Sequence, residues 1–246
     1  MSRRTHLLPA LLLPVAAGAA LCPDSRPAPA MRLSLRIHPF VGEERLQLGD
    51  GRYANPGGDG EFAVGDFQFF ISNVRLLADA SEFREADSYH LARFDGEDAT
   101  YVIALEDVPR DAYARVEFGI GVDSAANASI ASVGDLDPNG RMAWGWDVGY
   151  KFVLFEGALE LGDRRIPLVY HVGFDENYVE VRLPIDAASW EREQATLDIC
   201  VDLLKMFDGA RTVDMSELSN VKFDRGDARL LASNYARMVS LCPGSS

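Results

Sequence analysis

Basic residues are scarce in this chain. Its 246 residues include 24 lysines and arginines against 38 aspartates and glutamates, a formal net charge of −14. A nucleic-acid-binding protein needs a basic face to meet the phosphates, so we expect no nucleic-acid partner. The chain is nevertheless rich enough in hydrophobic residues, at 48%, to exclude a disordered or collagen-like protein.

The motifs of common enzyme classes are also missing. The sequence contains no G-x-S-x-G, no H-E-x-x-H and no P-loop, the patterns that supply a nucleophile, a catalytic zinc site or a phosphate cradle. Without a Cys-x-x-Cys pair, a structural zinc site is not expected either. We therefore interpret the chain as a binding protein and not as an enzyme.

Long apolar runs are confined to the N-terminus. Arg3 and Arg4 precede an apolar run over 7–20 that ends in small residues. This pattern predicts a signal peptide over 1–20, followed by a flexible leader over 21–30, and export to the periplasm or the cell surface. No stretch reaches the roughly 18 apolar residues of a membrane span, so the protein is not expected to cross a membrane.

Only three cysteines are present, too few for a disulfide framework. Cys22 follows the signal peptide and raises lipoprotein anchoring as a less favoured alternative, because Leu21 stands where lipid attachment requires a small residue. Cys200 lies in an apolar alternation and is interpreted as a core residue. Cys22 and Cys242 lie near the two ends, and their pairing is left open.

The body of the chain shows the period-two alternation of β-strands. Strands are expected at 33–38, 67–72, 87–94, 101–105, 114–122, 150–161, 166–173, 178–183 and 196–203, and a helix only at 226–239. In the strand at 114–122, Val116, Phe118 and Ile120 are expected to face the core. Many short strands with almost no helix predict an all-β fold, a β-sandwich-like antiparallel domain over 31–242 with long loops and a short C-terminal helix.

Histidine is scarce, with four residues in the chain. His38, His90 and His171 each lie in a predicted strand. A strand histidine that is simply hydrogen-bonded is the commoner case. Two imidazoles that meet across a sheet would instead form a nitrogen site suited to copper.

A second candidate site is the acidic turn that starts at Asp135. Asp135, Asp137 and Asn139 alternate as in the first half of a calcium loop, and Asp123 and Asn127 from the preceding segment would complete the oxygen shell. The glutamate that closes an EF-hand is replaced by Trp146. A plain turn held by its own Asp and Asn side chains explains the same residues.

Two tryptophans, Trp144 and Trp146, lie directly after this turn. Tryptophans so placed are usually packing residues. A redox role, as an electron relay to a haem protein, is the alternative.

Several short motifs resemble one known family. They are the segment Tyr53-Ala-Asn55-Pro-Gly-Gly, the run Phe67 to Leu76 with its Ile-Ser-Asn core, Ser88-Tyr89-His90-Leu91, Phe118 to Ser124, Gly134 to Pro138, Met142 to Tyr150, Phe155-Glu156-Gly157 and Tyr170 to Gly173. In this order they resemble the MbnP-like family, which includes methanobactin-associated MbnP and MopE/CorA-type copper-binding proteins. The resemblance covers about 31–240.

The resemblance implies an exported β-sandwich that binds copper, and by motif position the ligands would be His38 and His90. The third ligand in well-known members is a kynurenine made from a tryptophan near the first histidine. Here 37–42 contains no tryptophan, so that ligand cannot form locally. Some members act with a dihaem cytochrome c peroxidase-like partner.

Three functions therefore stand beside one another. The first is an exported copper-binding protein in copper acquisition or handling, holding Cu(I) through two strand histidines. The second is a β-sandwich binding module without copper that is stabilised by calcium. The third is a redox partner of a dihaem peroxidase-like protein.

Overall fold

The computed structural model describes residues 30–95, 99–129, 134–145, 148–186, 193–209 and 211–244. The predicted signal peptide, Cys22 and Trp146 lie outside the described residues, as does the predicted leader apart from its last residue.

The described residues form two β-sheets. The first, sheet A, has the order β15 (Val239–Leu241), β13 (Gln194–Asp202), β1 (Ala30–Val41) and β2 (Glu44–Arg45), and β7 (Tyr101–Pro109) pairs with β1. Sheet B has the order β12 (Val179–Pro184), β8 (Arg115–Ile120), β4 (Glu61–Leu77), β10 (Gly149–Leu161), β11 (Arg164–Gly173) and β14 (Asn220–Val221). Also in sheet B, β3 (Tyr53–Ala54), β5 (Glu82–Arg84) and β6 (Tyr89–Arg93) pair with β4, and β9 (Ala143–Gly145) pairs with β10.

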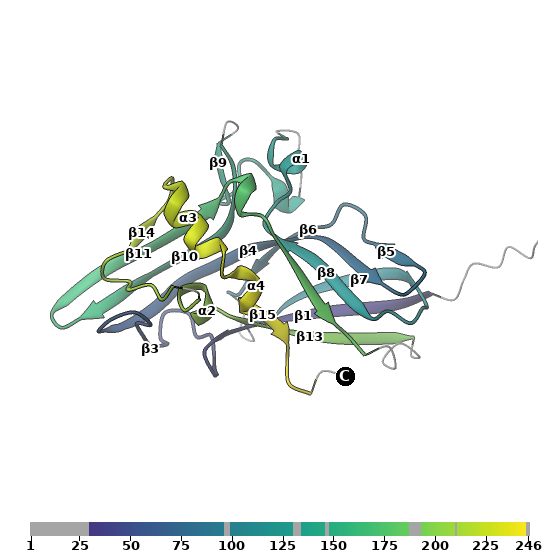
Figure 1. Cartoon of the computed structure of the whole chain (residues 1–246), viewed down its shortest axis with the longest axis horizontal. Helices are drawn as coiled ribbons and strands as arrows, with labels where there is room; N and C mark the ends of the chain where they lie inside the picture. The colour runs from purple at the N-terminus through teal and green to yellow at the C-terminus, as the bar shows by residue number, and fades with distance from the viewer. Residues whose placement is uncertain are drawn as a thin grey trace, which may run out of the picture.

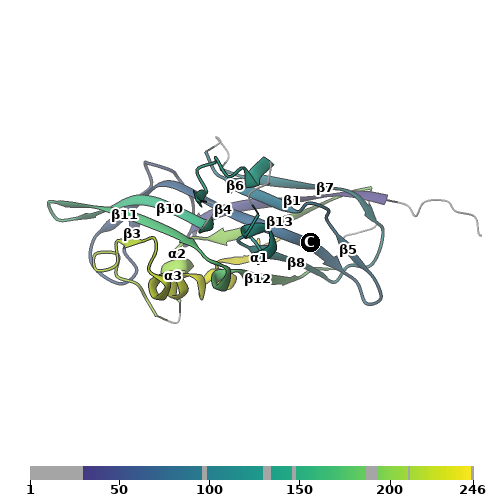
Figure 2. The same cartoon turned by 90° about the horizontal axis from the view of Figure 1, so that it is seen from above.

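The all-β, sandwich-like prediction is confirmed, and Figures 1 and 2 show an elongated molecule with the β10–β11 hairpin extending at one end. Most strand pairs are antiparallel, but β1 and β13 run parallel. That pair joins segments about 160 residues apart, so no local pattern reveals its direction.

Helices are short and few in the described part of the chain. They are α1 (Ser124–Asn127), α2 (Leu204–Phe207), α3 (Arg225–Ala232) and α4 (Tyr235–Met238), with 3-10 turns η1 (Gly134–Leu136) and η2 (Asp175–Asn177). The single helix predicted over 226–239 is wrong in its continuity. It breaks at Ser233 and Asn234, and its last residue already belongs to β15.

The main core lies between the sheets, where alternate residues of each strand point inward. Leu33, Leu35 and Ile37 of β1 are buried there, as are Val116, Phe118 and Ile120 of β8. The far face of sheet B is also covered, because the segment between β8 and β10 folds over it. Phe70 lies in this second cluster together with Leu136 and Tyr150, so β4 is buried on both faces at that point.

The expectation that Cys200 is a core residue is wrong. Cys200 is bonded to Cys242 in a disulfide with a Cα–Cα distance of 5.0 Å, which also excludes a Cys22–Cys242 pair. The alternation of β13 explains the error. Leu197, Ile199 and Val201 take the buried positions, which leaves Cys200 half-exposed on the outer face, where the antiparallel strand β15 brings Cys242 alongside.

Candidate metal centre

His38 lies on the outer face of sheet A, in the middle of β1. Its Nε2 is 2.6 Å from Oδ1 of Asp198 on β13, and its Nδ1 is 3.2 Å from the hydroxyl oxygen of Thr100. Arg36 donates to the other carboxylate oxygen of Asp198 at 2.7 Å. Burial raises the pKa of Asp198, but the hydrogen bonds from Arg36 and His38 outweigh it and hold that pKa below its usual value.

His90 lies on β6 in sheet B, opposite Ile71 of β4. Its Nε2 is 2.8 Å from Oε2 of Glu85, which also accepts a hydrogen bond of 2.5 Å from the hydroxyl of Ser88. Nδ1 of His90 makes no hydrogen bond to the described residues.

The two histidines therefore share one arrangement. In each, a carboxylate holds Nε2, and Nδ1 has only a weak partner or none among the described residues. A metal-binding histidine almost always has its other ring nitrogen bonded to such a group, which fixes the tautomer and the ring orientation. In both side chains Nδ1 is therefore the ring nitrogen that no carboxylate among the described residues holds.

Thr100 and Tyr101, at the start of β7, lie near His38, and the charge of Glu85, the partner of His90, acts on Tyr101. Thr100 contacts His38, and the next residue, Tyr101, pairs with Ile37 across sheet A. Burial raises the pKa of Tyr101 to about 12, and the negative charges of Asp135 and Glu85 act in the same direction. Glu85, the partner of His90, is therefore an electrostatic neighbour of the segment that contacts His38.

No group of three or more histidine, cysteine, aspartate or glutamate side chains with metal-site geometry occurs among the described residues. A pair of imidazoles without a further donor suits a soft cation of low coordination number better than Cu(II) or a hard cation.

The residues of the predicted calcium shell have separate hydrogen-bonding roles. Asp123 caps α1, where it accepts from two backbone amides and from Asn73 and Tyr89. Asn127 accepts from the amide of Tyr150 and donates to Asp175.

The acidic turn is held by hydrogen bonds of its own side chains, as expected for a plain turn. Asp137 accepts from both the backbone and side-chain nitrogens of Asn139, and Asp135 accepts from the backbone amide of Leu91 at 2.7 Å. The turn is held by its own side chains, and the calcium shell stays a prediction.

Trp144 of β9 is half-buried between two phenylalanines. Its ring centroid is 5.2 Å from the ring of Phe174 and 5.2 Å from that of Phe223. This is a packing environment, and a redox role for Trp144 or Trp146 stays a prediction.

The sequence model of the MbnP family matches residues 30–223. The chain belongs to the MbnP family. Among solved structures, MbnP from Methylosinus trichosporium superposes with a TM-score of 0.55 at 16% identity, over 86% of this chain and 98% of that one. At that identity the match shows a shared fold, and no curated protein sequence matches significantly. No helix among the described residues of this MbnP-family protein is long and apolar enough to span a membrane.

Sequence reasoning missed the carboxylates that orient the two histidines of this MbnP-family chain. Asp198 lies two residues before Cys200, and in a strand that spacing places both on one face. Its closeness to His38 depends on the parallel β1–β13 pairing, which carries no local signal. Glu85 is nearer in sequence, five residues before His90, but the turn that folds it back is not a recognisable motif.

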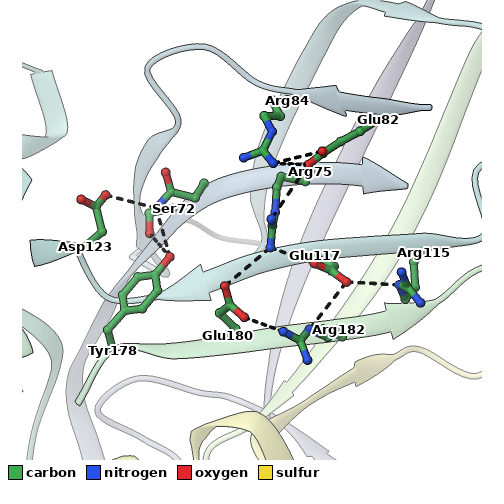
Figure 3. Close-up of polar contacts among 11 residues, drawn as sticks. Ser72, Arg75, Glu82, Arg84, Arg115, Glu117, Asp123, Tyr178, Glu180 and Arg182 are labelled. Atoms are coloured by element: carbon green, nitrogen blue, oxygen red, sulfur yellow. Dashed lines mark hydrogen bonds and ion pairs between the residues drawn. The ribbon is translucent and has the colours of Figure 1, made fainter. Parts of the chain in front are cut away.

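A second polar cluster, on the outer face of sheet B, was also missed. The Glu117 side chain is only 7% exposed, and Arg75, Arg115 and Arg182 converge on it at 2.8, 3.1 and 3.6 Å. Figure 3 shows these side chains spanning β4, β8 and β12, with Glu180 and Glu82 at the margin. The guanidinium groups compensate the buried charge, so the cluster joins three strands.

Proposed function

We propose that this protein is an exported copper-binding protein that holds Cu(I) through Nδ1 of His38 and Nδ1 of His90, in copper acquisition or handling. Membership of the MbnP family supports the copper chemistry. The positions of His38 and His90 in the family-like motifs support the residue assignment, and the carboxylate on Nε2 of each ring is the contact that would orient it.

Imidazole binds a metal only when it is neutral, so acid should weaken copper binding by protonating the ligand nitrogens. Asp198 and Glu85 would orient the rings. Thr100 would give up its contact with Nδ1 of His38 when the metal binds.

The test is a competition titration of purified, disulfide-bonded protein against a coloured Cu(I) chelator, with ascorbate to keep copper reduced. Wild type is compared with His38→Ala, His90→Ala and the double variant. His171→Ala is the matched control, because His171 is also a strand histidine whose Nε2 lies 2.8 Å from a carboxylate, that of Glu156. We expect the double variant to lose at least tenfold in affinity and the control to match wild type. Full affinity in the double variant, or an equal loss in His171→Ala, contradicts the assignment.

Export is part of the same proposal and has its own test. Expression of the full-length chain in a secreting host, followed by mass measurement of the mature protein, should give a chain that begins directly after residue 20. A mass increased by lipid on Cys22 would show lipoprotein anchoring instead.

A further inference from the structure

The outer face of sheet A carries two sulfur atoms beside His38 that the proposed copper site does not use. His38, Asp198, Cys200 and Cys242 line one open depression of about 340 Å³. His38 is the register partner of Cys200 across the parallel strands β1 and β13. The backbone amide of Cys242 donates to the carbonyl oxygen of Asp198 at 2.9 Å. One imidazole, one carboxylate and two sulfurs therefore lie on a single face, supplied by adjacent segments of the sheet.

The orientation of His38 gives its two nitrogens different surroundings. Nδ1 points toward Thr100, next to β7, whereas Nε2 points toward Asp198 on β13. Asp198 and Cys200 are two residues apart on that strand and so project from the same face. The nitrogen left over by the proposed copper site is thus the one on the sulfur side.

We propose that reduction of the Cys200–Cys242 disulfide creates a second metal site, in which both thiolates and Nε2 of His38 bind Cu(I), and the metal replaces the contact of Nε2 with Asp198. Thiolates are the ligands that Cu(I) and Zn(II) prefer, and two thiolates with one imidazole form a common donor set for such cations. The inference shares His38 with the proposed function but does not depend on His90.

The reaction balances with a dithiol as the reductant. A thiolate of the dithiol attacks one sulfur of the half-exposed disulfide, and its second thiol resolves the mixed disulfide. The protein disulfide gains two electrons and two protons, and the dithiol becomes a disulfide. The incoming cation then displaces the two thiol protons to solvent, as metal binding by cysteine requires.

The local structure allows the sulfurs to separate. Tetrahedral metal–sulfur bonds of about 2.3 Å require the two sulfurs to lie roughly 3.7 Å apart. The Cα atoms are 5.0 Å apart, and Cys242 follows the last residue of the three-residue strand β15. Rotation of its side chain at the end of that short strand opens space for an ion.

The experiment measures metal binding before and after reduction. Purified protein is titrated with Cu(I) against a competing chelator in ascorbate, first with the disulfide intact and then after anaerobic treatment with dithiothreitol and its removal by desalting. We expect reduction to tighten Cu(I) binding at least tenfold. Zn(II), added to the reduced protein, should slow the reaction of both thiols with an alkylating reagent.

Two samples without thiolate donors serve as controls. One is the Cys200→Ser/Cys242→Ser double variant. The other is reduced wild type with both thiols alkylated, which keeps the proposal testable if the serine variant does not fold. Neither should gain affinity after the reducing treatment. An equal gain in either sample, or no gain in wild type, overturns the proposal.

The histidine variants separate this inference from the proposed function. After reduction, His90→Ala should reach the Cu(I) affinity of reduced wild type, whereas reduced His38→Ala should bind more weakly. Equal affinity of reduced His38→Ala and reduced wild type overturns the role of His38 in this site. The proposed function is tested separately, with the disulfide intact. It fails if the His38→Ala/His90→Ala double variant binds Cu(I) as tightly as wild type.

Discussion

A carboxylate on each sheet is held by cationic side chains, but the two clusters differ in burial and in the kind of cation. Glu117 on sheet B is 7% exposed and is met by three guanidinium groups. Asp198 on sheet A is 23% exposed and is met by Arg36 and by His38. Guanidinium keeps its charge at every pH a protein experiences, whereas imidazole changes charge near neutrality and binds metals. The first cluster is suited to hold strands together, and the second to carry chemistry.

The largest loss of stability is expected from Phe118, which lies next to Glu117 on β8 but on the opposite face of that strand. Phe118 is buried in the main core, and Phe118→Ala should cost roughly 3–5 kcal/mol of unfolding free energy because it leaves a cavity. Urea unfolding measures it. Arg115→Ala is the control on the outer face, where the Arg115 side chain is 51% exposed. Arg75 and Arg182 stay on Glu117 in this variant, so the loss should be well below that of Phe118→Ala. Equal losses from the two variants would contradict the assigned facing of β8.

The next effect concerns the Glu117 carboxylate itself. Glu117→Gln keeps the shape of the side chain but removes the charge that Arg75, Arg115 and Arg182 share. Hydrogen bonds to charged groups contribute about 1.5–3 kcal/mol each to stability in mutational series, so we expect a loss of about 2 kcal/mol. Chemical denaturation at neutral pH checks this value. A loss no greater than that of an exposed pair would remove the distinction between the two clusters.

The matched change on sheet A is Asp198→Asn, which also preserves shape. Because the Asp198 pair is partly exposed, its loss should cost less than about 1 kcal/mol of stability. Its expected effect is on metal affinity instead, since the carboxylate orients His38. The measurements are urea unfolding and Cu(I) competition on the same sample. A stability loss as large as that of Glu117→Gln, with unchanged affinity, would assign Asp198 a structural role.

Periodicity was sufficient to predict the buried face of β1 and of β8. The inward positions of β1 and β8 follow directly from alternate apolar residues, and these are local patterns. Phe70 is the instructive exception, because it occupies an outward position of β4 and is buried by the segment that crosses the far face of sheet B. Coverage of a second face is a tertiary property that alternation does not encode.

The partners of the candidate site could not be predicted for the same reason. His38 was identifiable by its rarity and motif, but Asp198 and Cys200 reach it only through a parallel pairing of segments about 160 residues apart. Cys200 was taken for a core residue because its neighbours are apolar. Strand parity, counted from Leu197, already places it on the outer face, so part of that error was avoidable.

A histidine whose pKa differs between the folded and the unfolded chain makes stability depend on pH, and His171 is such a residue. Burial lowers the pKa of His171 below its ordinary value of 6.5, and the positive charges of Lys151 and Lys222 act in the same direction, against the hydrogen bond to Glu156. Between its folded pKa and 6.5 the unfolded chain binds more protons than the folded protein. Stability therefore rises with pH through that window, levels off above about pH 6.5 and falls as the pH drops below it.

The smallest predicted effect is the contribution of His171 to the rise of unfolding free energy with pH. His171→Asn should flatten the dependence of unfolding free energy on pH just below pH 6.5, relative to wild type, because the titrating group is gone. Glu117→Gln should keep the wild-type slope, because β8 lies three strands away from β11 in sheet B. Urea unfolding of the three proteins at half-unit pH intervals makes the comparison. A wild-type slope in His171→Asn would assign the pH dependence to the remaining histidines, and a changed slope in Glu117→Gln would show that the arginine cluster is coupled to a titrating group.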